Sequence, residues 1–95
     1  MARTEVSQQR FLESTMAAAR AGRRDAFYEL GIAFSVGSNG VNVDLIEAHK
    51  WFNLAAMSGD ERAALDRSEV AADMTPAEIA AAQREARAFL VATRH

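Results

Sequence analysis

Residues 26–63, AFYELGIAFSVGSNGVNVDLIEAHKWFNLAAMSGDERA, decide the fold of this chain. Two segments with apolar residues at helical spacing flank a glycine-rich turn at residues 37–40. Small residues and aromatic residues alternate along both segments, so that two helices could approach each other closely. We therefore predict two short helices folded back on each other across the turn.

The order and spacing of these residues resemble the Sel1-like repeat, a relative of the tetratricopeptide repeat. Phe34 departs from the pattern, because the family more often has Tyr there. The resemblance implies an all-α fold, an α/α superhelix of paired helices, and a role as an interaction scaffold. The matching positions are Ala26, Leu30, Gly31, Phe34, Gly37, Gly40, Val41, Asp44, Ala48, Trp51, Ala55, Ala56, Gly59 and Ala63.

Helix signals continue on both sides of this stretch, and we expect about five helices in all. The first begins near Thr4 or Ser7, either of which is a suitable N-cap. Thr75 and Pro76, with a glutamate three residues after the threonine, are a strong start for the last helix. The other four helices are expected at about residues 24–36, 44–58, 60–72 and 76–92.

The segment AARAGRRDA at residues 18–26 recurs as AAMSGDERA at residues 55–63, an offset of 37 residues. This period is typical of helical solenoids. Gly31 lies in the middle of the helix expected at 24–36, where glycine lowers the stability of a helix. That cost is explained if a neighbouring backbone or Trp51 comes close there. We predict one Sel1-like domain over residues 1–95, with one clear repeat at 26–63 and degenerate half-repeats at 4–25 and 64–93.

The composition is that of a globular protein, with 49% apolar and 25% charged residues and no cysteine among 95 residues. Disulfides and Cys-based metal sites are therefore excluded. No apolar run approaches the roughly 20 residues that a membrane span needs, and no signal peptide is evident. We expect a cytoplasmic protein, although a segment cut from a longer exported protein would have the same sequence features.

The charge is unevenly distributed along a chain whose net charge is −2. Residues 1–24 carry five arginines and two glutamates, or +3, whereas residues 44–73 carry seven acids and three bases, or −4. Arg20, Arg23 and Arg24 could contact phosphates, but the overall acidity argues against nucleic acid as the partner. We interpret these arginines as a solvated face.

Residues that could carry chemistry have simpler structural explanations. Trp51 is expected in the core, and His49 on an exposed helix face, since no second ligand lies one turn away. Asp44 and Glu47 are interpreted as helix caps and residues 37–40 as a turn without the signature of a phosphate loop. The sequence therefore predicts no enzyme, no metal site, no cofactor and no small-molecule substrate.

On the helix at 24–36, Tyr28, Ile32 and Ser35 form a row that the packing of the repeat does not need. Adding 37 to these residue numbers gives Leu65, Glu69 and Ala72 on the helix at 60–72. In the family the first helix of each pair lines the concave side, so the resemblance implies a shallow groove for a protein or peptide. An alternative leaves Tyr28 and Ile32 packed against the first or the last helix. The expected groove residues are Tyr28, Ile32, Ser35, Leu65, Glu69 and Ala72.

Three functions remain open on this evidence. The first is a non-catalytic interaction module or adaptor, including a regulator or inhibitor of a bacterial client protein. The second is a structural protein that assembles with itself through exposed repeat ends. The third, ranked last, is nucleic-acid binding through the arginines near the N-terminus.

Overall fold

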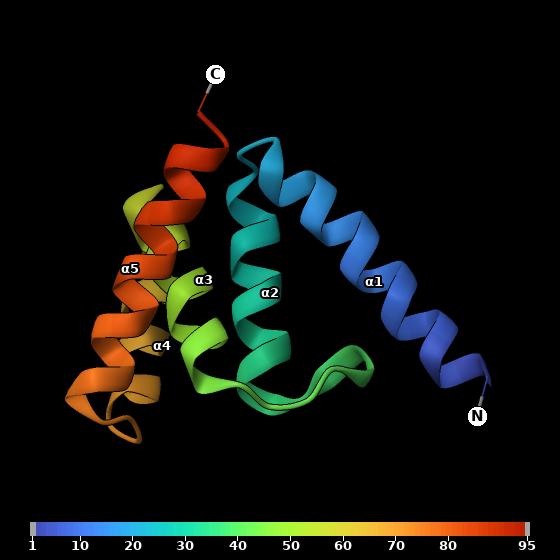
Figure 1. Ribbon diagram of the computed structural model, residues 1–95, viewed down its shortest axis with the longest axis horizontal. Coiled ribbons are helices and arrows are strands. Elements are labelled where there is room, and N and C mark those ends of the chain that lie inside the picture. The colour runs from blue at the N-terminus through green and yellow to red at the C-terminus, as the bar shows by residue number, and fades with distance from the viewer. Residues whose placement is uncertain (1, 95) are drawn as a thin grey trace.

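A computed structural model describes residues 2–94 of the chain and the side chains of residues 6–94 (Figure 1). Within this range the fold is all-α, as predicted, and no helix is both long enough and apolar enough to cross a membrane. The elements are α1 (Ala2–Arg20), α2 (Arg24–Val36), the 3₁₀ turn η1 (Ser38–Gly40), α3 (Leu45–Met57), α4 (Glu61–Ala71) and α5 (Pro76–Ala92).

Helix α3 is the centre of the arrangement, because it packs against α2, α4 and α5 (Figure 1). Helix α1 leans away from the other helices and contacts α2 and η1. It begins at Ala2, earlier than either Thr4 or Ser7. The five helices agree with the sequence prediction, whereas their assignment to a superhelix stays a prediction.

Helices α2 and α3 lie close together at Gly31. A Cβ atom added there would lie 2.5 Å from Cε1 and 2.9 Å from Cγ of the Phe52 ring, so only glycine fits without a shift. The prediction of a close approach is confirmed, but the expected neighbour is wrong. Phe52, rather than Trp51, occupies the space that the missing side chain leaves.

Trp51 lies in the core, as expected, with no exposed surface. Its ring is stacked on Phe27 of α2 at 6.1 Å between centroids and meets the edge of Phe89 of α5 at 5.0 Å. Its Nε1 donates a hydrogen bond of 2.9 Å to Oε2 of Glu47. One aromatic cluster thereby joins three helices, and its only indole N–H is satisfied within α3.

The turns that follow α1 and α3 are alike in their hydrogen bonds. Gly22 and Gly59 both have positive φ, and each donates its N–H to the carbonyl three residues earlier. The next residue, Arg23 or Asp60, donates to the carbonyl five residues earlier, which completes a Schellman motif. The 37-residue offset thus joins two equivalent turns.

The predicted caps also form. Asp44 accepts a hydrogen bond from the N–H of Glu47, and Gly37 ends α2 in the left-handed conformation. Thr75 and Glu78 make a reciprocal capping box. The Glu47 side chain does not complete a box with Asp44, because its oxygens bind Lys50 and Trp51 instead.

Candidate interaction site

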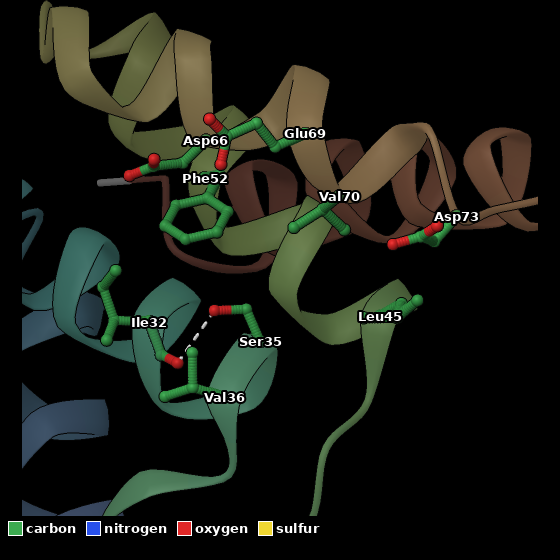
Figure 2. A pocket seen from close by; sticks show the side chains of 9 residues that line it. All are labelled: Ile32, Ser35, Val36, Leu45, Phe52, Asp66, Glu69, Val70 and Asp73. Atoms are coloured by element: carbon green, nitrogen blue, oxygen red, sulfur yellow. Dashed lines mark hydrogen bonds between the residues drawn. The ribbon is translucent and has the colours of Figure 1, made fainter.

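A hollow of about 300 Å³ lies between α2, the N-terminal part of α3 and α4, and Figure 2 shows its side chains. Its lining is mainly apolar on the α2 side and acidic on the α4 side. We call it the α2–α4 hollow. Its nine lining residues are Ile32, Ser35, Val36, Leu45, Phe52, Asp66, Glu69, Val70 and Asp73.

The α2 wall consists of residues three and four apart, which share one face of a helix. Ile32 is half-buried, and Val36 at the last position of α2 is 66% exposed. Between them, the Ser35 hydroxyl donates a hydrogen bond of 3.0 Å to the Ile32 carbonyl. With that hydroxyl engaged by its own helix, the wall presents mainly hydrocarbon to the hollow.

The bottom of the hollow is formed by the buried Phe52 ring. The glycine at position 31 allows this ring to lie directly against α2, which brings the two walls close to each other. Leu45, at the start of α3, and Val70 add apolar surface at one end (Figure 2). The shape of the hollow is therefore set by the packed interface of α2 and α3.

Three acids, Asp66, Glu69 and Asp73, line the α4 side. Among the described residues, the ion pairs join Lys50 to Glu47 and Glu85, and Arg62 to Asp60. None of these pairs includes an acid of the hollow, and none of the nine lining residues is basic. The hollow therefore combines hydrocarbon with an uncompensated negative charge.

Tyr28, about one turn before Ile32 on α2, fixes α2 against α4. Its hydroxyl donates a hydrogen bond of 2.7 Å to Oδ2 of Asp66, and this bond is the main reason that the pKa of Tyr28 is raised. The guanidinium of Arg62 lies 4.0 Å from the centre of the Tyr28 ring. The hydrogen bond orients Asp66, and both contacts place Tyr28 at the interface of the two helices.

The structure brings together three of the six residues expected in a groove: Ile32, Ser35 and Glu69. Tyr28 contacts α4 and the Phe52 ring at 5.7 Å, and so belongs to the helix interface. Leu65 and Ala72 are exposed and lie outside the lining of the hollow.

Sequence reasoning missed the residues that complete the hollow on α4. Asp66 and Asp73 line it in place of Leu65 and Ala72, one position later along the helix in each case. A shift of one residue turns a helix face by about 100°. The hydrogen bond between Tyr28 and Asp66 fixes the rotation of the two helices, and this pairing between distant residues shows only in the structure.

His49 was expected on an exposed helix face, and this expectation is wrong. It is 4% exposed, and its Nδ1 has no hydrogen-bond partner. Burial, with a smaller effect from the Arg67 charge, lowers the pKa of His49. Helix α3 is covered by α2, α4 and α5, so the face that carries His49 is buried although Glu47 and Lys50 lie beside it in the sequence.

The arginines near the N-terminus lie apart from the hollow. Nη1 of Arg24 donates a hydrogen bond of 3.4 Å to the carbonyl of Ser58, which joins the two Schellman turns. Arg20 lines a separate hollow of about 360 Å³ that also includes Phe89 and Arg94. Among the described side chains, residues 6–94, no group of three His, Asp or Glu is placed to hold a metal ion.

Comparison with known proteins gives no relative from which a function could be transferred. No family model, no curated protein and no solved structure matches the chain. The resemblance to the Sel1-like repeat therefore stays a prediction from the residues that carry it.

Proposed function

We propose that this chain is a non-catalytic protein-interaction module and that the α2–α4 hollow receives a segment of a partner protein. The observation that carries the proposal is an apolar hollow on packed helices. Its α2 wall ends in Val36, a valine that is 66% exposed. Leaving such a side chain in water gives up the free energy of burying it, which a partner would recover.

The size of the hollow favours a peptide over a cofactor. Small-molecule sites usually have volumes of about 300–1,000 Å³ and enclose most of the ligand. At about 300 Å³ and open on one side, this hollow has room for one or two side chains. The remaining binding energy would come from residues that lie across the rims formed by α2 and α4.

Selection from a displayed library of short random peptides tests the proposal. The immobilised 95-residue chain should enrich peptides that lose about tenfold or more in affinity when Val36 is changed to Gln. The larger polar side chain would then stand in the mouth of the hollow. Val91→Gln is the matched control, because Val91 is 62% exposed on α5 and lies outside the hollow. Equal binding by both variants, or no enriched peptide, would reject the proposal.

Self-assembly is a second candidate function, favoured by exposed apolar side chains away from the hollow. Met57, Leu65 and Val91 are 62–70% exposed, and they lie on α3, α4 and α5. Sedimentation over a hundredfold range of concentration would test it, and a monomer throughout would exclude it. The adaptor or inhibitor role and a cytoplasmic location stay predictions until a partner is identified.

A further inference from the structure

We infer that the segment bound in the α2–α4 hollow is cationic, with Lys or Arg side chains facing α4 and an apolar side chain facing α2. The inference rests on the proposed function, because it specifies the partner of the same site. Its basis is the difference between the two walls, which are hydrocarbon on one side and carboxylate on the other.

Two acids of the α4 wall, Glu69 and Asp73, make no ion pair with the described residues, whereas Asp66 accepts the hydrogen bond of Tyr28. Glu69 lies in the last turn of α4, and Asp73 lies two residues beyond the end of that helix. A carboxylate in the last turn of a helix faces the negative end of the helix dipole, so the placement of Glu69 is unfavourable. Together with Asp66, these two acids concentrate like charges along one side of the hollow, and a basic side chain would relieve their repulsion.

The basic residues of α4 are held by other partners. Arg62 makes a bidentate contact with Asp60, with Nη2 at 2.9 Å from Oδ2, and its guanidinium covers the Tyr28 ring. Nη1 of Arg67 donates a hydrogen bond of 2.6 Å to Oδ1 of Asn53. The charge that complements the wall must therefore come from the bound segment.

The spacing of the acids defines the pattern of the segment. Asp66 and Asp73 are seven residues apart: the five steps from Asp66 to Ala71 rise about 7–8 Å along α4, and Asp73 lies two residues beyond its end. An extended peptide covers that rise in about two to three residues. Two basic residues this far apart, with an apolar side chain directed to Ile32 and Val36, match both walls at once.

A double variant removes two of the three charges without changing the shape of the wall, and it leaves Asp66 bonded to Tyr28. Glu69→Gln with Asp73→Asn should weaken the selected peptides about five- to tenfold, the amount expected for two partly exposed ion pairs. Glu13→Gln with Asp25→Asn is the matched control, since it removes the same charge from exposed sites on α1 and α2 that make no ion pair with the described residues and lie outside the hollow. Raising NaCl from about 0.05 M to about 0.5 M should reduce the difference between the two double variants.

The outcomes separate this inference from the function on which it rests. Basic peptides that lose affinity only in the Glu69/Asp73 variant support the inference. Neutral or acidic peptides that still depend on Val36 would overturn it while the proposed function stands. Equal losses of affinity in both double variants would show that binding depends only on the net charge of the chain, and would also overturn the inference.

The chain itself has a basic segment at its N-terminus, and this provides one more arm of the test. A synthetic peptide of residues 2–24, which carries five arginines and two glutamates, is added as a competitor to the best selected peptide. Failure to compete supports a different protein as the partner. Competition at the same concentration as the selected peptide would assign the hollow to a second copy of this chain and overturn the assignment to another protein.

Discussion

Changing Gly31 to Ala should destabilise the protein, although alanine is normally the better residue in a helix. The added methyl group would lie 2.5 Å from Cε1 of Phe52, whereas ordinary contacts begin at 3.4 Å. Phe52 is 1% exposed, so its ring can yield only by giving up packed contacts or by moving into the hollow that it lines. Overpacking of this kind costs about 1–3 kcal/mol, and contact with several ring atoms favours the upper end of that range.

The gain in helix propensity offsets about 1 kcal/mol of that cost, which leaves a net loss of about 2 kcal/mol. For a domain of this size the loss corresponds to a Tm lower by about 8–16 °C, measurable by circular dichroism. Glu29→Ala is the control, because it adds propensity on the same helix at an exposed site. Combining Gly31→Ala with Phe52→Leu should cost less than the sum of the single changes. A Tm for Gly31→Ala at or above that of the wild type would refute the reasoning.

Three further predictions concern buried polar groups. Folding lowers the pKa of His49, so the unfolded state binds more protons below about pH 6.5. The free energy of unfolding should therefore fall as the pH is lowered from about 7.5 to 5.5. His49→Gln should flatten this decline, measured by urea unfolding. The chain has one tyrosine, so phenolate absorbance reports Tyr28 alone: it should titrate above pH 10, and Asp66→Asn should lower its pKa. Glu47→Ala should cost about 1–3 kcal/mol, measured by urea unfolding, because it leaves the Trp51 N–H buried without an acceptor.

The limits of the helices could be predicted from the sequence because local chemistry sets them. Gly37 ends α2 in a left-handed conformation, and Thr75 begins α5 with a capping box, each through contacts within a few residues. The expected ranges of α2 and α4 accordingly agree with the structure to within about a residue. The start of α1 was misplaced, because the residues taken as caps lie inside the helix.

Contacts between helices were predicted less well, since they depend on how each helix is rotated about its axis. Phe52 and Trp51 are neighbours on α3, and the pattern could not tell which of them meets Gly31. His49 is buried because α3 is central, a position that its sequence shows only through apolar residues on several faces.

The groove predicted from the repeat shares part of its residues with the observed hollow for a similar reason. Transfer by 37 residues assumes that α4 has the same rotation as α2. The hydrogen bond between Tyr28 and Asp66 instead places the lining one residue later, at Asp66 and Asp73. Ile32 and Ser35 on α2, where no transfer was needed, both line the hollow, and their role in a binding groove stays a prediction.

Nuclear magnetic resonance of the ¹⁵N-labelled chain, titrated with a peptide selected on it, tests the binding site most directly. Binding in the α2–α4 hollow predicts that the largest amide shifts occur at Ser35, Val36, Leu45 and Val70, which line it from three helices. The amides near Arg20 and Leu90, at the other hollow, should shift little. Shifts concentrated at that second hollow, with the α2–α4 hollow unchanged, would contradict the account.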